Sequence, residues 1–340
     1  MAMNNQPEEL SDNSNSFAPA VQNRTDLSGI KAMADSIRSE IGKIIVGQHR
    51  MVDLLITALL ANGHVLVEGV PGVAKTLTSR LFARTLSTDF SRIQFTPDLM
   101  PADVIGTSVF NPKTTEFNFK EGPVFSNVVL IDEINRSPAK TQAALFEVMQ
   151  ERQISVDGTT YAMEEPFIIL ATQNPIEHEG TYKLPEAQLD RFLFKINVDY
   201  PDQDQETAIL EGVHKRKNQN NPSQLDPVVE PNRLIQNQSL VSDIHVERSL
   251  MQYITDITQH SRNHPSIHIG ASPRAAVFIM RAAQAWAAIN GRDFVIPDDI
   301  QDIARPVLRH RLILTPEKEM EGTKTDEVVT QILKQIEVPR

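Results

Sequence analysis

The sequence predicts an α/β fold: a parallel five-stranded sheet with helices on both faces, followed by a smaller all-helical domain. Short β-rich runs alternate with helical stretches up to about residue 200, which is typical of a parallel sheet covered by crossover helices. The five runs are His64–Glu68, Arg92–Phe95, Asn127–Ile131, Phe167–Thr172 and Phe192–Asn197. After Tyr200 the chain is helix-rich and shows no convincing run of strands, which favours a separate unit.

We therefore divide the chain near residues 25 and 200. Residues 1–25 are rich in Asn, Ser, Gln and Pro, so we expect a flexible tail. Residues 26–200 are the predicted sheet domain, and residues 201–340 are the predicted helical domain. The sheet domain is expected to open with an amphipathic helix, because apolar residues recur at helical spacing at Ile30, Met33, Ile37, Ile41 and Ile44.

Two segments interrupt the alternation and predict β-hairpin inserts. Residues 109–119 contain the turn Asn111-Pro112-Lys113, and residues 154–162 contain the turn dipeptide Asp157-Gly158. Hairpins at such places are either surface decoration or contacts for a partner. A third polar stretch, residues 214–224, predicts a surface loop.

Composition excludes several classes of protein. The chain has 33 Lys and Arg against 44 Asp and Glu, and a net charge of −11 disfavours a broad grip on nucleic acid or on an anionic membrane. The absence of cysteine excludes disulfides, thiolate catalysis and cysteine-based metal sites. No segment has transmembrane length, and the first residues do not resemble a secretory signal. We therefore expect a cytoplasmic protein with no direct membrane insertion.

A phosphate-binding loop follows the first predicted strand. The segment Gly69-Val70-Pro71-Gly72-Val73-Ala74-Lys75-Thr76 opens a helical pattern, the context in which backbone N–H groups cradle phosphates. We expect Lys75 to reach the β- and γ-phosphates of ATP, Thr76 to place its hydroxyl on Mg²⁺, and Leu77 to complete the nucleotide-binding segment. Ala74 replaces the usual second glycine. We interpret this as tolerable because Ala74 enters the helix, whereas Gly72 is the position that needs positive φ. The alternative is an ordinary glycine turn.

An apolar strand ends in two carboxylates, at Asp132 and Glu133. A buried strand has no packing reason to end in this way, whereas a metal and water site supplies one. We expect Asp132 to hold Mg²⁺ through water and Glu133 to deprotonate the attacking water, which contributes about 10²- to 10⁴-fold in rate. The alternative is a solvated strand end.

A further polar residue follows the predicted strand Phe167–Thr172. Asn174 stands at the same edge of the sheet, where ligands bind in folds of this kind. It is a candidate for contact with the γ-phosphate or the attacking water. The alternative is an Asn-Pro turn formed with Pro175.

These motifs together resemble the MoxR family of AAA+ ATPases, over roughly residues 41–312. The specific pieces are GVPGVAKT at Gly69–Thr76, QFTPDLMPADVIGT at Gln94–Thr107, EGPVF at Glu121–Phe125, LIDEINR at Leu130–Arg136, MQERQISVDG at Met149–Gly158 and ATQNPIEHEGTYKLPEAQLDRF at Ala171–Phe192. The resemblance implies an AAA+ P-loop domain followed by a helical lid domain. It also implies that the two hairpins correspond to inserts of this AAA+ branch.

The resemblance assigns roles to three further residues. Asn174 resembles the first sensor, Arg274 the second sensor, and Arg191 the arginine given to the neighbouring subunit's ATP. Such an arginine can stabilise the transition state by about 10³- to 10⁵-fold. For Arg191 the alternative is a surface ion pair with Asp190 or Glu186.

Other residues compete for these roles or complete the nucleotide site. Arg136 and Lys183 are rival candidates for the arginine or lysine that acts in trans. By resemblance, Val46-Gly47-Gln48 lies beside the adenine, with Ile45 and Val46 available for apolar contact. Because Arg274 starts a helix after Pro273, it could report the γ-phosphate to the lid.

The implied function is ATP hydrolysis by a ring-shaped homo-oligomer, a hexamer by resemblance, that remodels or activates client proteins. The resemblance implies clients with a von Willebrand factor A domain. One rival is a nucleic-acid motor of the clamp-loader or branch-migration helicase type, against which the acidic balance speaks. The other is a nucleotide-gated scaffold with little turnover, against which Glu133 and Asn174 speak.

Overall fold

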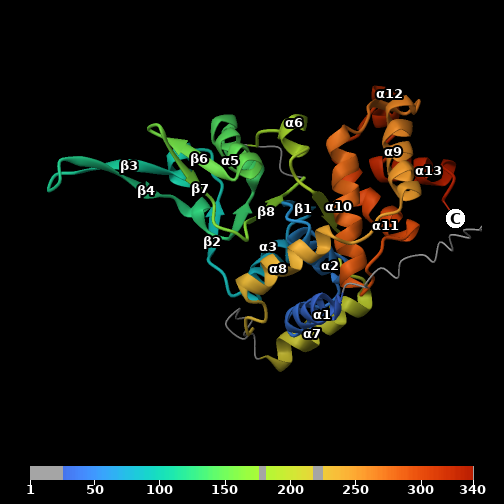
Figure 1. Cartoon of the computed structure of the whole chain (residues 1–340), viewed down its shortest axis with the longest axis horizontal. Coiled ribbons are helices and arrows are strands. Elements are labelled where there is room, and N and C mark those ends of the chain that lie inside the picture. Colours follow the sequence, from blue (N-terminus) through green and yellow to red (C-terminus); the bar gives the residue numbers. More distant parts are fainter. Residues whose placement is uncertain (1–25, 176–180, 217–224, 340) are drawn as a thin grey trace, which may run out of the picture.

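The computed structural model describes residues 26–175, 181–216 and 225–339. A parallel sheet of five strands, in the order β2-β5-β8-β1-β9, forms its centre (Figure 1). Its strands are β1 (Val65–Gly69), β2 (Phe90–Gln94), β5 (Val128–Asp132), β8 (Ile168–Gln173) and β9 (Phe194–Val198). Each predicted run lies within two residues of one of these strands, so the predicted sheet is confirmed.

The register of the sheet brings the predicted motifs to one edge. In β1, Glu68 lies opposite Gln173 of β8 and Asn197 of β9, and in β2 Gln94 lies opposite Asp132 of β5. Because all neighbouring pairs are parallel, every carboxyl end lies at this edge. Every residue of β5 is buried, as expected for a central strand covered on both faces.

Helices cover both faces of the sheet, as predicted. One face packs on α1 (Ser28–Gly42), α2 (His49–Leu60) and α3 (Lys75–Arg84), and the other on α4 (Pro101–Ile105) and α5 (Ala139–Glu151). Alternate residues of β5 divide between the two cores: Leu130 packs with the first set and Ile131 with the second. The short turns η1 (Pro123–Phe125), η2 (Ile134–Arg136) and α6 (Glu186–Leu189) complete this part.

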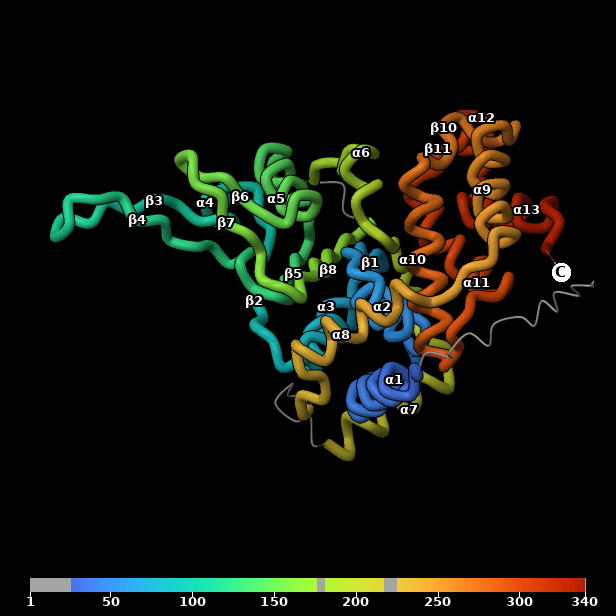
Figure 2. The backbone as a smooth tube through the Cα atoms, viewed as in Figure 1, coloured from blue at the N-terminus to red at the C-terminus, as the bar shows by residue number. Residues whose placement is uncertain are grey.

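Both predicted inserts are hairpins. The first pairs β3 (Gly106–Asn111) with β4 (Glu116–Glu121), and the second pairs β6 (Gln153–Val156) with β7 (Thr159–Ala162). The Phe119 and Tyr161 rings lie 4.4 Å apart, so the two hairpins pack on each other at their bases. The tip of the β3–β4 hairpin projects far from the rest of the molecule (Figures 1 and 2).

The chain beyond β9 is helical, as predicted. Its helices are α7 (Gln203–Lys215), α8 (Pro231–Ser242), α9 (Arg248–Asn263), α10 (Pro273–Ile289), α11 (Pro297–Leu308), α12 (Pro316–Met320) and α13 (Thr325–Gln335). The structure adds a small antiparallel ribbon that the sequence did not indicate, formed by β10 (Ile267–Ile269) and β11 (Ile313–Leu314). With two or three residues each, these strands are too short for an alternating pattern to reveal.

The lid packs directly on the N-terminal helices. Buried side chains of α1, α2 and α10 belong to one continuous hydrophobic cluster, which includes Ile37, Leu55 and Ile279. The lid is therefore held by an apolar interface as well as by the chain connection. Among the described helices, none combines the length and the apolar character needed to cross a membrane. The predicted tail at residues 1–25 and most of the predicted loop at 214–224 lie outside the described residues.

Candidate nucleotide-binding site

The predicted phosphate loop joins β1 to α3 and lines a cavity of about 440 Å³ at the carboxyl edge of the sheet. The cavity is lined by Pro71, Gly72, Val73, Ala74, Lys75, Thr76, Leu77, Arg92, Gln94, Asp132, Glu133, Thr172, Gln173 and Asn174. The sheet thus brings together the loop, the two carboxylates and the sensor amide, which the sequence spreads over about a hundred residues. Gly69 and Val70 form the start of the loop behind this cavity.

Lys75 and Thr76 occupy the positions that phosphate binding requires. The Lys75 ammonium donates to the carbonyl oxygens of Gly69 and Val70, which holds its charge over the loop. The Thr76 hydroxyl donates to Asp132 Oδ1 at 2.8 Å. Since α3 begins at Lys75, its free N–H groups and the positive end of its dipole face the cavity.

The expectation for Ala74 is wrong in its backbone conformation. Ala74 does not enter the helix but is its left-handed N-cap, with φ 59° and ψ 24°. A left-handed alanine costs about 1–2 kcal/mol, because its Cβ approaches the following carbonyl oxygen. The second glycine of the common motif would relieve this strain. Gly72, with φ 88°, does adopt the positive φ that was expected of it.

Asp132 is the centre of a hydrogen-bonded cluster. Besides Thr76, its carboxylate accepts from Thr172 Oγ1 at 3.1 Å and pairs with Arg92 Nε at 2.6 Å. A hydroxyl beside a carboxylate is a donor set that suits Mg²⁺, which takes its other ligands from water and phosphate. Consistently, no group of three or more His, Cys, Asp or Glu within the described residues forms a complete metal site of its own.

Glu133 is oriented by two donors that act on the same oxygen. Gln94 Nε2 donates to Glu133 Oε2 at 2.9 Å, and Arg136 Nε lies 3.0 Å from that oxygen. The Glu133 backbone is left-handed, and its N–H donates to Thr172 Oγ1 at 3.1 Å. Arg136 thus pairs with a carboxylate of its own chain, and its role in trans stays a prediction. Asn174 is buried in the same cavity, 6% exposed.

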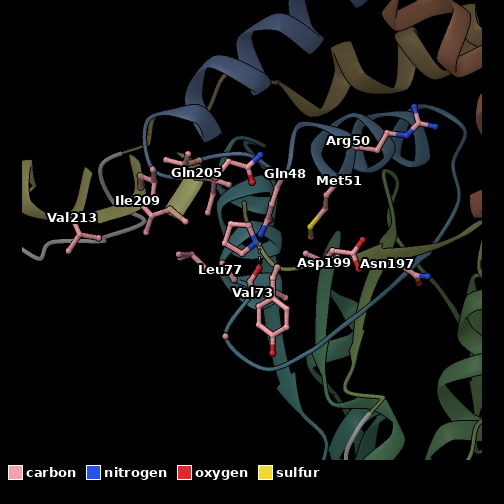
Figure 3. Close-up of a pocket in the computed structure, with 18 of the residues that line it drawn as sticks. Gln48, Arg50, Met51, Val73, Leu77, Asn197, Asp199, Gln205, Ile209 and Val213 are labelled. Carbon is pink, nitrogen blue, oxygen red and sulfur yellow. Dashed lines mark hydrogen bonds between the residues drawn. The ribbon is translucent and has the colours of Figure 1, made fainter. Parts of the chain in front are cut away.

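A cavity of about 360 Å³ adjoins the phosphate loop and is lined by Ile44, Ile45 and Val46 (Figure 3). Gln48 also lines it but serves the loop as well: its Nε2 donates to the Val73 carbonyl at 2.6 Å, and its Oε1 accepts from Thr78 at 2.8 Å. The residues predicted to lie beside the adenine line this apolar cavity, and we name it the purine cavity after that prediction.

Gly47 sits behind the purine cavity and does not line it. Its φ is 71°, and a Cβ at this position would meet the Gln205 side chain of α7 at 2.8 Å. Gly47 therefore lets the segment before α2 and the first lid helix approach each other.

The two predicted arginines lie together, away from this chain's phosphate loop. Arg191 and Arg274 line a separate cavity of about 200 Å³, with Arg152 and Arg281 among its other residues. Asn62, Gly63 and His64 also line it, and these residues precede β1, whereas the phosphate loop follows β1. The arginine cavity and the phosphate loop are therefore at opposite edges of the sheet, about 17 Å apart along a five-residue strand.

The structure gives both arginines contacts within the chain. Arg191 donates to the carbonyl oxygen of Phe146 and forms no ion pair with Asp190 or Glu186 within the described residues. Arg274 starts α10 as expected, but it lies 3.4 Å from Asp190 Oδ2 and outside the phosphate cavity. Its role as second sensor stays a prediction.

Arg311 fixes the segment that carries Arg191. Its side chain is 1% exposed and donates to Asp190 Oδ1 at 2.7 Å and to the Phe192 carbonyl at 2.5 Å. These contacts lie on both sides of Arg191. Burial lowers the pKa of Arg311 to about 10, and the adjacent Asp190 carboxylate opposes that shift, so the guanidinium remains charged at neutral pH.

Comparison with known proteins places this site in a family. Residues 64–194 match the ATPase family associated with various cellular activities, and residues 259–332 match an AAA lid domain. Chaperone MoxR1 of Mycobacterium tuberculosis is 44% identical over 310 residues, which cover 88% of this chain and 81% of that protein. The chain belongs to the MoxR family of AAA+ ATPases. It therefore binds nucleotide and hydrolyses ATP.

Other relatives agree with this membership. Protein MoxR of Paracoccus denitrificans is 30% identical over 295 residues, covering 80% of this MoxR-family chain and 86% of that one. The protein YeaC of Bacillus subtilis (strain 168) is 47% identical over 300 residues, with coverages of 88% and 92%. A crystal structure of a candidate ATPase from Cytophaga hutchinsonii ATCC 33406 superposes with a TM-score of 0.83 at 42% identity, covering 92% and 96% of the two chains.

Several site residues of this MoxR-family ATPase escaped the sequence analysis. Arg92 and Gln94 stand at the end of β2, and their alternation along a strand edge gives no local sign of contact with Asp132 and Glu133. Arg311 lies more than a hundred residues from the Asp190 it contacts. A search for polar residues at the ends of all five predicted strands would have found Gln94, whereas Arg311 has no such signal.

Proposed function

We propose that this chain is a Mg²⁺-dependent ATPase that works as a ring in the cytoplasm, most simply a hexamer, and that it remodels or activates protein clients. One observation supports the proposal of a ring: the arginine cavity and the phosphate loop lie at opposite edges of the same sheet. Since Arg191 cannot reach this chain's own ATP, a neighbouring copy must supply it. Copies joined head to tail in this way form a ring when the rotation between neighbours closes, and a ring is the arrangement proposed here.

Arg274 belongs, on this proposal, to the same trans constellation. It lies in one cavity with Arg191, Arg152 and Arg281, and none of the described residues that line this cavity is a carboxylate. Burial is the main reason that the pKa of Arg152 is lowered, and the neighbouring Arg281 lowers it further. A partner's triphosphate would relieve this repulsion, and arginines bind phosphate oxygens in a forked geometry.

The reaction proposed is in-line attack of water on the γ-phosphate. The loop amides and Lys75 bind the phosphates, and Glu133 takes the proton of the attacking water while Asn174 orients the water or the γ-phosphate. Thr76 and Asp132 would hold Mg²⁺, which neutralises charge on the phosphate oxygens. In that state Arg92 must leave Asp132 Oδ2, so we expect Arg92 to respond to metal and nucleotide.

The protein client is proposed from the relatives and from one surface. A relative at 44% identity is named a chaperone. The β3–β4 hairpin exposes Phe110 (49%) and Phe117 (72%), with ring centroids 5.3 Å apart, on an arm that projects from the body. Exposed paired aromatics are typical of protein contacts. We propose that they bind the client, a protein with a von Willebrand factor A domain.

The ring proposal is tested by steady-state phosphate release over a concentration series, with and without Mg²⁺. We expect turnover per chain to rise with concentration and to fall at least about a hundredfold in Lys75→Ala and in Arg191→Ala. Arg84→Ala, which removes a cation from the end of α3, is the matched control and should retain turnover. Full turnover by a monomeric preparation would refute the ring.

The client proposal has its own test. Deletion of residues 110–117, which removes both phenylalanines, should abolish retention on an immobilised von Willebrand factor A domain protein and leave basal phosphate release within about twofold of the full chain. Trimming the β6–β7 turn at residues 157–158 provides the comparison. Retention that survives the first deletion would remove the β3–β4 hairpin from the client contact.

A further inference from the structure

Besides the arginine cavity, the chain has another cavity lined by cationic side chains. It adjoins the purine cavity, and we call it the lid cavity. It has a volume of about 380 Å³ and lies between α2, β9, α11 and α13. Arg50, Met51 and Asn197 line both the lid cavity and the purine cavity, and Figure 3 shows Arg50 and Asn197 on the side away from Val213 of α7. No residue lines both the lid cavity and the phosphate cavity, so the phosphates held at Lys75 do not meet its cations.

The lid cavity is positively charged although the chain carries a net charge of −11. Four cationic side chains line it, and Asp302 is the single carboxylate among its lining residues. The four are Arg50, Arg305, Arg309 and Lys334. Such a cluster of cations on an acidic protein raises the local concentration of anions in the cavity above that in bulk solvent.

These cations are only partly neutralised by the protein. Arg309 pairs with Asp326 at 2.9 Å. Arg50 donates to the backbone carbonyl of Asp302 at 2.7 Å and lies 4.5 Å from the centre of the Trp286 ring, which fixes the guanidinium without cancelling its charge. Arg305 and Lys334 are exposed, and their side chains make no ion pair or hydrogen bond with any described residue.

The cations also repel one another. Burial is the largest cause that lowers the pKa of Arg50. The carboxylates of Asp302 and Asp53 oppose that shift, and the charge of Arg305 is a smaller cause that lowers the pKa. Arg309 is affected in the same way, first by burial and in part by Arg50. A bound anion would relieve this repulsion, whereas water alone leaves it in place.

Beneath the cationic rim, the floor of the lid cavity is apolar. It consists of buried side chains, namely Met51, Leu54, Ile196, Pro306 and Leu333. A basic rim over an apolar floor suits a molecule that has both an anionic group and an apolar body. The volume of the cavity is also in the range of small-molecule sites and exceeds what an inorganic ion needs.

We propose that the lid cavity binds a small organic phosphate, with the phosphate at Arg50, Arg305 and Lys334 and the apolar body on the floor. Guanidinium groups bind phosphate in forked pairs, which makes phosphate a better match than a single carboxylate. The ligand would join the lid helices to α2, next to the nucleotide. The site is independent of the proposed ring, because it lies within one chain.

The test uses phenyl phosphate as the probe, which carries a phosphate and an apolar ring. The full chain is first saturated with Mg²⁺ and ADP, so that the phosphate loop is filled, and phenyl phosphate is then titrated in by calorimetry. We expect a Kd of about 1 mM or tighter, with inorganic phosphate at least about threefold weaker because it cannot use the floor.

Two double variants locate the binding. Arg305→Ala with Lys334→Ala should weaken phenyl phosphate at least about tenfold. Arg248→Ala with Lys318→Ala removes the same charge from lid positions outside the cavity and should leave the Kd unchanged. The ADP affinity and circular dichroism of both double variants should match the unaltered chain, which establishes that they fold.

Three results would overturn the lid-cavity site. The first is no binding of phenyl phosphate up to about 10 mM by the ADP-saturated chain. The second is an equal loss of affinity in both double variants, which would indicate a general effect of charge. The third is loss of binding in Lys75→Ala, which would place the probe at the phosphate loop. None of these binding results bears on the dependence of turnover on protein concentration. The ring proposal is therefore tested separately.

Discussion

At the scale of single residues, the phosphate loop contains a strained alanine. Ala74 adopts φ 59°, in the left-handed region that glycine occupies without cost. We predict that Ala74→Gly keeps ATP binding and raises the free energy of unfolding by up to about 1 kcal/mol, because relief of strain exceeds the entropy that glycine adds to the unfolded chain. Urea unfolding of the ligand-free chain measures this. A destabilised variant would contradict a left-handed conformation at Ala74.

Gln94 is expected to position the catalytic base. Its amide and Arg136 both act on Glu133 Oε2, so removal of the amide frees one side of the carboxylate. We predict that Gln94→Ala lowers kcat about three- to tenfold and leaves the KM for ATP unchanged, since the loop and Lys75 still bind nucleotide.

Thr96→Ala is the matched control for Gln94→Ala. Thr96 follows the same strand but donates only to Asp98, at 2.6 Å. Its turnover should stay within about twofold of the unaltered chain. A KM rise with unchanged kcat in Gln94→Ala would instead assign the amide to nucleotide binding.

The sequence predicted residues whose chemistry is local, and it failed where contacts are distant. Lys75, Thr76, Asp132 and Glu133 come from short motifs, each next to a strand end, and the parallel sheet brings them into one cavity. Ala74 was misjudged because backbone φ depends on how the loop closes, which residue type alone does not state.

At the scale of elements, Arg311 connects the lid to the turn before β9 that carries Arg191. It donates to Asp190 and Phe192, on either side of Arg191, and its guanidinium lies 4.9 Å from the centre of the Phe278 ring. Lysine cannot reproduce this forked contact. We predict that Arg311→Lys lowers turnover at least about tenfold while the ADP affinity stays constant, because the phosphate loop is untouched.

The comparison for Arg311→Lys is Arg309→Lys, two residues earlier. Arg309 pairs with Asp326 and makes no contact with residues 190–193. It should keep turnover and the ADP affinity. If Arg311→Lys also lost ADP binding, the cause would be a general loss of folding and not a displaced Arg191. Thermal unfolding of both variants distinguishes the two causes.

The position of the lid was the least predictable element. The helical character of the lid was predictable, as was the start of α10 at Pro273, because Pro is common at the first position of a helix. The sequence did not indicate that α10 packs on α2, nor that Arg274 therefore lies beside Arg191. Packing between segments more than two hundred residues apart leaves no periodic signal in either segment.

At the scale of the whole molecule, stability should fall in mild acid. His64 is buried and neutral: its Nδ1 accepts from the Ile169 N–H at 3.0 Å and its Nε2 lies 3.1 Å from the Met149 carbonyl. Burial, with the charge of Arg152, lowers the pKa of His64 to about 3, and burial also lowers the pKa of His310 well below its ordinary value. Both histidines are protonated far more readily in the unfolded chain.

Protonation of these histidines in mild acid therefore favours the unfolded chain. Below the ordinary histidine pKa of about 6.5, the unfolded chain binds protons that the folded chain does not, so the free energy of unfolding falls by up to about 1.4 kcal/mol per pH unit for each histidine. Urea unfolding between pH 7.5 and 5.5 measures the slope. His64→Gln keeps one donor and one acceptor but cannot titrate, so its slope should be shallower; an unchanged slope would mean that His64 ionises in the folded chain.

The assembly itself yields the sharpest prediction. Lys75→Ala removes the phosphate site but keeps Arg191, and Arg191→Ala does the reverse, so each variant alone has no complete site. In an equal mixture that exchanges freely, half of the subunits have an intact phosphate loop and half of those have a neighbour with Arg191. Turnover should therefore return to about one quarter of the unaltered level. If Arg191 acted only within its own chain, mixing would restore nothing, because no subunit would contain both groups.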